Sequence, residues 1–148
     1  MGTKYEGTAD EVRALNSYIK LNRASESIMN RTTEHLGHYN LTLSQFSVLE
    51  ALHHLGKLTQ VELAQKLLKS TGNMTTVLQN LEKRGLICRQ RSADDQRYVF
   101  VTITETGREL ITRIFPTHVA GIVQAMGALS AEEQETLAAL CRKLGIGQ

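Results

Sequence analysis

Apolar residues recur every three or four positions along most of the chain, which is the spacing of one buried face of an α-helix. This pattern predicts a long first helix from Ala9 to Leu36, closed by Gly37. Five further helices are predicted to begin after Thr42, after Thr59, after Ser70 or Thr71, at Thr104–Glu105 and after Ser130. The chain is therefore mainly helical.

Residue types that start and stop helices stand at the edges of these segments. A threonine or serine followed three positions later by Glu or Gln predicts a capping box, in which each side chain bonds the other residue's amide. The boxes are Thr42 with Gln45, Thr59 with Glu62, and Ser130 with Glu133. Gly56, Gly85 and Gly145 stand where helices end, and Pro116 predicts a kink in the fifth helix because it lacks an amide donor.

The hydrophobic period changes to two between the fourth and fifth helices. Leu86–Arg91 and Tyr98–Ile103 alternate as half-buried strands do, and the polar, turn-prone segment Ser92–Gln96 joins them as a hairpin tip. A short helix, a second helix and a two-stranded ribbon in this order predict a winged helix-turn-helix over residues 40–104. We expect a single unit over 1–148, with helical segments at 8–37 and 105–148 on either side of the winged portion.

The fourth predicted helix carries two different faces. Met74, Val77, Leu78 and Leu81 recur at helical spacing and predict the buried face. The opposite side is small, polar and almost free of charge, which suits hydrogen bonding to bases and phosphates. The candidate DNA contacts on this helix are Ser70, Thr71, Asn73, Thr75, Thr76, Gln79, Asn80 and Lys83. The candidates on the ribbon are Arg91, Asp95, Gln96 and Arg97.

Charge is concentrated in the same region. The formal net charge is +2, but residues 57–97 hold eight Lys and Arg against four Asp and Glu, so this part carries +4 and the remainder −2. A local cationic excess favours an anionic partner such as double-stranded DNA. A hydrophobic content of 41% is that of a globular protein. No apolar stretch approaches the length of a membrane span, so no membrane partner is expected and the cytoplasm is the expected location.

Three stretches resemble the MarR (multiple antibiotic resistance regulator) family of bacterial winged helix-turn-helix regulators. They are Leu41–Leu49, Leu81–Ile87, and the wing signature Asp95-Gln96-Arg97 with Val101–Gly107 downstream. The resemblance covers nearly the whole chain. It implies a transcription regulator, expected to act as a repressor, that binds a pseudopalindromic operator as a homodimer. The first, fifth and sixth helices would form the dimerisation region, at 8–37 and 105–148.

The resemblance also implies a role for the hairpin tip. Asp95 would hold Arg97 by a charge-assisted bond, while Arg97 or a neighbouring cation reaches the DNA minor groove. Gln96 departs from the family pattern, because relatives often carry a second arginine there, and glutamine lacks the charge that a narrow groove attracts. The alternative is an ordinary surface ion pair.

Family members commonly release DNA when a small aromatic or phenolic compound binds near the first, second and fifth helices. The resemblance therefore predicts an effector pocket, and this chain offers Tyr39, Phe46, Phe115 and His118 as its aromatic wall and polar handle. The alternative for each of these side chains is simple core packing.

Other functions are less well supported by the sequence. Histidines 35, 38, 53, 54 and 118 leave a metal-sensing regulator as an alternative, although no cofactor or metal site is predicted from their spacing. Cys88 and Cys141 are predicted to be reduced, buried and inert. A winged-helix protein-interaction module is a second alternative. No phosphate loop, nucleophile elbow or zinc-protease motif is present, so an enzyme is not expected.

Overall fold

A computed structural model of the chain describes residues 2–67 and 69–145, with the backbone alone at Thr71. It divides into two compact units. One contains the chain up to Glu34 and from His118 onward, and the other contains His35–Thr117.

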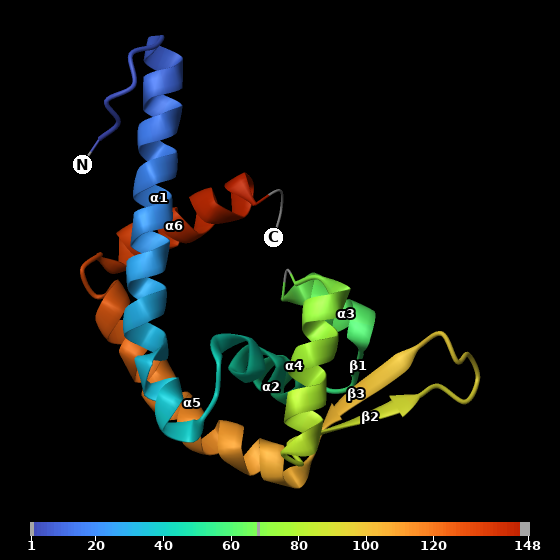
Figure 1. Ribbon diagram of the computed structural model, residues 1–148. Helices are drawn as coiled ribbons and strands as arrows, with labels where there is room; N and C mark the ends of the chain where they lie inside the picture. The colour runs from blue at the N-terminus through green and yellow to red at the C-terminus, as the bar shows by residue number, and fades with distance from the viewer. Residues whose placement is uncertain (1, 68, 146–148) are drawn as a thin grey trace. The chain divides into compact units, whose positions relative to one another are not determined.

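The unit His35–Thr117 contains most of the regular structure (Figure 1). Its helices are α2 (Leu43–Leu55), α3 (Gln60–Lys66), α4 (Thr71–Lys83) and the first part of α5 (Glu105–Met126). Its strands are β1 (Leu58–Thr59), β2 (Ile87–Arg91) and β3 (Val99–Ile103). They form an antiparallel sheet in the order β1-β3-β2, in which Val101 pairs with Leu58 on one side and Arg89 on the other.

One hydrophobic core holds this unit together. It collects side chains from every helix and from the sheet, and its largest fully buried members include Phe46, Leu49, Leu52, Leu63, Met74, Leu78, Leu81, Ile87, Ile111 and Ile114. The predicted apolar face of the fourth helix is thus the face that anchors α4 in the core. The β2–β3 hairpin extends away from this core (Figure 1).

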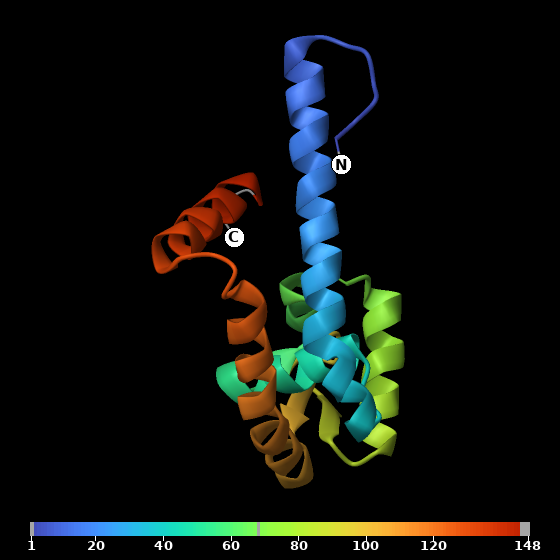
Figure 2. The same cartoon turned by 90° about the vertical axis from the view of Figure 1, so that its left-hand side faces the viewer.

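The other unit is formed by α1 (Ala9–Thr33), the second part of α5 and α6 (Ala131–Leu144). The segment before α1 folds back along that helix (Figure 2), and the Thr3 amide donates a 2.7 Å hydrogen bond to Oδ1 of Asn16. Large apolar side chains remain exposed on its helices: Tyr18, Leu21, Met29, Val119, Ile122, Val123, Leu140 and Leu144. No residue of α6 that the structure describes is buried.

The local signals for helix ends agree with the structure, with one exception. Thr42, Thr59 and Ser130 form the expected capping boxes, Ser70 caps α4, and Gly56 and Gly85 have φ of 79° and 71°. The predicted end of the first helix is wrong. The α-helix stops at Thr33 and a 3₁₀-helix, η1 (Glu34–Tyr39), continues through Gly37.

The correction at Gly37 has a physical reason. Leu36 and Leu41 are both buried, and the Leu41 amide bonds the Leu36 carbonyl, so the chain must reverse between them. The reversal falls on Asn40, whose φ of 53° occupies the left-handed region that asparagine tolerates better than most residues. Gly37 is therefore not the terminating residue.

The expectation of a two-stranded ribbon also needs amendment. The ribbon is part of a three-stranded sheet, to which β1 adds two residues. Two residues are too few to show an alternating pattern, so the sequence did not predict β1. The fifth helix passes through Pro116 without ending there. The boundary between the two compact units follows Pro116 by one residue.

Candidate nucleic-acid interface

Helix α4 presents a polar face because its apolar face is fixed in the core. The Ser70 hydroxyl accepts the Asn73 amide at 3.2 Å and starts the helix, while Met74, Leu78 and Leu81 are completely buried. The side chains on the opposite side are exposed: Asn73, Thr76, Gln79, Asn80 and Lys83. Most of the predicted contacts on this helix therefore share one accessible surface, which we call the α4 face.

Thr75 differs from the rest of the predicted set. It is half-buried, and its hydroxyl accepts a 2.7 Å hydrogen bond from Nε2 of Gln60 on α3. Thr75 therefore joins two helices within the helix-turn-helix. The side chain of Thr71 lies outside the described residues.

A groove of about 360 Å³ runs between α4 and the first turn of α2. It is lined by Thr42, Ser44, Gln45, Lys69, Asn73, Thr76, Val77 and Asn80. None of the described residues that line it is acidic, so none of them repels a phosphate. Ser44 and Lys69 were not among the sequence candidates. The capping box of Thr42 and Gln45 locates the first turn of α2, but its placement beside α4 depends on packing.

The C-terminal end of α4 is bonded to two distant parts of the unit. Glu82 accepts the Arg89 side chain at 3.0 Å and the Arg89 amide at 3.1 Å, which ties α4 to β2. The hydrogen bond from the Arg89 side chain lowers the pKa of Glu82 below its ordinary value of 4.5. Arg84 donates from its two terminal nitrogens to the carbonyls of Asn40 and Tyr39, at 2.7 and 3.0 Å.

The hairpin tip is organised around the pair Asp95 and Arg97. Arg97 Nη2 lies 2.7 Å from Asp95 Oδ2, and Arg97 Nε and the Arg97 amide both donate to Oδ1 at 3.0 Å. This bonding lowers the pKa of Asp95 and raises the pKa of Arg97, so both stay charged. The expected charge-assisted bond is present, and the Arg97 side chain is still 85% exposed.

Arg91 supports the same tip from the end of β2. Its guanidinium donates at 2.5 Å to the carbonyl of Gln96, while the Ser92 amide bonds the Tyr98 carbonyl at 2.9 Å. The exposed Gln96 and Arg97 side chains therefore project from a bonded turn rather than from a loose loop.

The predicted burial of the two thiols is wrong, since both Cys88 and Cys141 are exposed. Cys88 follows the buried Ile87 on β2, and successive strand residues face opposite sides of a sheet, so Cys88 faces outward. It borders a hollow of about 260 Å³ in which Nζ of Lys57 lies 4.7 Å from the centre of the Phe100 ring.

The four candidate pocket residues occupy different surroundings. Phe46 is 1% exposed within the core, and the half-buried Tyr39 and Phe115 pack against that core. Phe115 also meets His54 edge-on, with ring centres 5.0 Å apart. The alternative of core packing thus describes Phe46 in this structure. His118 is buried and belongs to the other compact unit.

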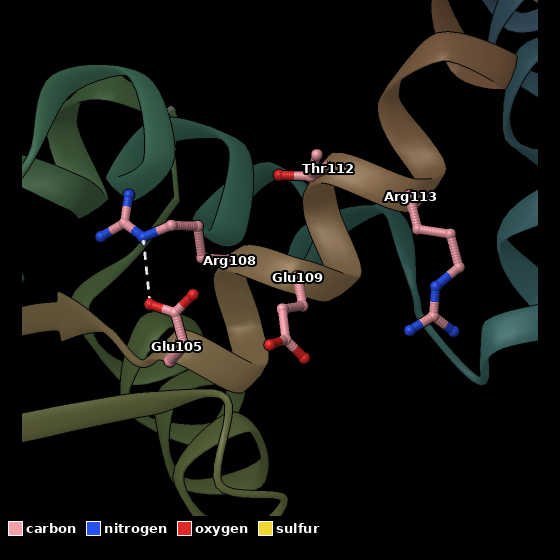
Figure 3. A pocket seen from close by; sticks show the side chains of 5 residues that line it. All are labelled: Glu105, Arg108, Glu109, Thr112 and Arg113. Atoms are coloured by element: carbon pink, nitrogen blue, oxygen red, sulfur yellow. Dashed lines mark ion pairs between the residues drawn. The ribbon is translucent and has the colours of Figure 1, made fainter.

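One hollow in the unit His35–Thr117 lies along α5 (Figure 3). It measures about 530 Å³ and is lined by Glu105, Arg108, Glu109, Thr112 and Arg113, all on one helix. Glu105 and Arg108 form an ion pair of 3.9 Å, and Arg108 and Arg113 point away from each other. Mixed charges that diverge from one helix form a solvated surface and not a binding site.

Within residues 2–67 and 69–145, no three His, Cys, Asp or Glu side chains are grouped closely enough to hold a metal ion. No single helix in the described part of the chain is both long and apolar enough to cross a bilayer.

Comparisons with known proteins relate this fold and surface to a family. A family model described as the MarR family matches residues 41–99. The HTH-type transcriptional regulator MhqR of Bacillus subtilis is 34% identical over 134 residues, which make up 90% of this chain and 92% of MhqR.

Two solved structures are similar in fold and sequence. A structure of Bordetella bronchiseptica BpsR, described as showing how 6-hydroxynicotinic acid regulates its DNA binding, is 26% identical with a TM-score of 0.79. The match covers 86% of this chain and 91% of the BpsR chain. NadR in complex with 4-hydroxyphenylacetate is also 26% identical, with a TM-score of 0.75 and full coverage of both chains.

Proposed function

Because the chain belongs to the MarR family of DNA-binding transcription regulators and is not an enzyme, we propose that it represses transcription by binding a two-fold symmetric operator as a homodimer. The α4 face would enter the major groove, and the hairpin tip with Arg91, Gln96 and Arg97 would reach the adjacent minor groove. The observation that carries this proposal is the exposed α4 face, which holds Lys83 and no acidic side chain, in the same compact unit as a bonded cationic tip.

The exposed apolar side chains of the other unit support the homodimer. Ile122 and Val123 on α5 and Leu140 and Leu144 on α6 are between 37% and 68% exposed in the single chain. Apolar helix faces of this kind are usually covered by a partner. Two symmetric copies would present their α4 faces to half-sites about 34 to 36 Å apart.

A small phenolic or aromatic acid is the proposed effector, and Tyr39 and Phe115 of the unit His35–Thr117 are its proposed contacts. The support is the likeness to BpsR and NadR, whose structures are described with hydroxylated aromatic acids. Such a ligand needs an apolar wall with few polar groups, which these side chains supply. Phe46 would support the wall from the core.

Selection of bound duplexes from a random pool tests the central proposal. We expect a two-fold symmetric consensus, and we expect sedimentation to give the mass of two chains. Lys83→Ala should weaken binding to that consensus and reduce the salt slope by about 0.9, because one phosphate contact is lost. Arg113→Ala removes one exposed charge from α5 and is the matched control.

The contrary results are equally definite. A protein that retains no duplex even at low salt is not acting through DNA, and a purely monomeric protein excludes the symmetric arrangement.

The effector proposal is tested separately with 4-hydroxyphenylacetate and 6-hydroxynicotinate, which should raise the unfolding temperature and release the selected duplex. If both leave the temperature and the duplex affinity unchanged, that class of effector is wrong.

A further inference from the structure

Arg84, the residue that ends α4, is bonded to a segment more than forty residues earlier in the chain. Its Nη1 donates to the Asn40 carbonyl at 2.7 Å and its Nη2 to the Tyr39 carbonyl at 3.0 Å. A guanidinium holds its donors in a rigid plane, so two such bonds fix an orientation as well as a distance. We call this arrangement the Arg84 clamp.

The clamp holds the chain where its direction is set for α2. Asn40 is the residue with left-handed φ, and Thr42, two positions later, is the N-cap of α2. The backbone between η1 and α2 is thus shaped by Asn40 and bonded through its carbonyls to the end of α4. The position of the first turn of α2 is therefore tied to Arg84.

That first turn forms one wall of the α2–α4 groove. Thr42, Ser44 and Gln45 line one side, and Asn73, Thr76 and Asn80 of the α4 face line the other. Recognition of a base edge requires side chains to be placed within about 0.5 Å. A bond that fixes α2 against α4 controls this placement without itself contacting DNA.

Lys83 and Arg84 are neighbouring exposed cations with different surroundings. The Arg84 guanidinium is occupied by two carbonyls of its own chain, whereas Lys83 lies on the α4 face. We infer that Arg84 is a positioning residue for DNA binding, which sets the α2–α4 groove through the Arg84 clamp and is not itself a phosphate contact. This inference rests on the proposed function of the α4 face.

The test exploits the difference between arginine and lysine. Arg84→Lys keeps the charge but cannot donate to both carbonyls in the same fixed geometry. We expect Arg84→Lys to lower affinity for the selected operator about tenfold, equivalent to about 1.4 kcal/mol, while affinity for unrelated duplex and the salt slope remain unchanged. Arg113→Lys, the same exchange at an exposed arginine of α5, is the matched control and should bind the operator as the wild type does.

A phosphate contact predicts the opposite pattern. If Arg84→Lys binds the operator normally while Arg84→Ala reduces the salt slope as Lys83→Ala does, the positioning role is overturned. Thermal unfolding separates a damaged fold from a displaced groove, because the exposed Arg84→Lys change should leave the transition temperature nearly unchanged. Loss of operator affinity that merely follows a lowered transition temperature also overturns the inference.

Hydrogen exchange tests the clamp without DNA. In Arg84→Lys the amides of residues 37–45 should exchange faster than in the wild type, while those of β2 and β3 should not change. Unchanged exchange in 37–45 overturns the clamp whether or not any operator exists. The wild type could select no duplex while Arg84→Lys still exchanges faster at 37–45. That result would refute the proposed function and the DNA-positioning role, and would support only the Arg84 clamp.

Discussion

Gln60 and Thr75 join α3 to α4 through a 2.7 Å hydrogen bond from Nε2 of the glutamine to the threonine hydroxyl. The bond lies near the N-terminal end of α4, and the Arg84 clamp lies at the other end. Helix α4 is therefore held at both ends by side chains that do not belong to the α4 face.

The first prediction concerns this bond. Gln60→Met and Thr75→Val should each destabilise the fold by about 1 kcal/mol, since a neutral hydrogen bond between partly buried groups is lost. The double variant should be little worse than either single one, which a double-mutant cycle of chemical denaturation will measure. Gln65→Met, at an exposed position of α3, is the control. Fully additive losses would show that the two side chains act independently.

The second prediction concerns the hairpin tip. Arg97→Ala should weaken operator binding about tenfold, the size of one lost groove contact, and leave thermal unfolding unchanged because the side chain is 85% exposed. Fluorescence anisotropy with the selected duplex at moderate salt measures the affinity. Arg108→Ala, which removes an exposed arginine from α5, should have no such effect. Wild-type affinity for Arg97→Ala would identify the pair as an ordinary surface ion pair.

The third prediction is a pH dependence at the junction of α4 and β2. Arg89 lowers the pKa of Glu82 in the folded state, so the bond contributes stability above pH 4.5 that is lost as the pH falls through the lower, folded pKa. Because the Glu82 side chain is 40% exposed, the contribution is less than about 1 kcal/mol. Denaturation of Glu82→Gln and wild type should differ at pH 7, and the difference should shrink as the pH falls below 4.5. A difference that grows in acid would contradict this sign.

The fourth prediction concerns a glycine of the wing signature. Thr104 Oγ1 accepts the Gly107 amide at 3.1 Å and donates to the Gly85 carbonyl at 2.7 Å, which brings α5 against the segment after α4. A Cβ on Gly107 would lie 2.2 Å from the Leu86 carbonyl oxygen. Gly107→Ala should therefore destabilise the fold by about 2 kcal/mol or more.

Gly72→Ala provides the comparison for Gly107. A Cβ at Gly72 meets nothing within 4 Å, and the residue lies in helix α4, so alanine there should be neutral or stabilising by up to about 1 kcal/mol. Thermal unfolding of the two variants decides the matter. Equal transition temperatures would mean that the backbone near Leu86 yields to the added methyl group.

Sequence patterns predicted the features that depend on near neighbours. A capping box such as Thr59 with Glu62 and a left-handed terminal residue such as Gly85 involve residues within four positions of each other. Gly37 failed as a helix end because burial of Leu36 and Leu41, a property of the folded core, moved the reversal to Asn40. A local pattern cannot show whether a nearby glycine or the burial of distant side chains decides where the chain reverses.

The candidate site divides in the same way. The exposed side of α4 followed from the spacing of its apolar residues, but the bond of Gln60 to Thr75 and the Arg84 clamp join residues far apart in sequence. Strand β1 was missed because two residues show no period. The exposure of Cys88 was available from strand alternation with Ile87, and the expectation of a buried thiol overlooked it.

The capping boxes of α2 and α3 differ in the residue that closes them, which is Gln45 in α2 and Glu62 in α3. Gln45 closes the box of α2 with an amide, whereas Glu62 closes that of α3 with a carboxylate whose pKa is lowered chiefly by its hydrogen bond to the Thr59 backbone. Acid therefore protonates Glu62 and weakens the capping box at the start of α3, while the capping box of α2 stays intact. The helix-turn-helix should begin to fray in acid from its middle helix, with the wall formed by α2 still in place.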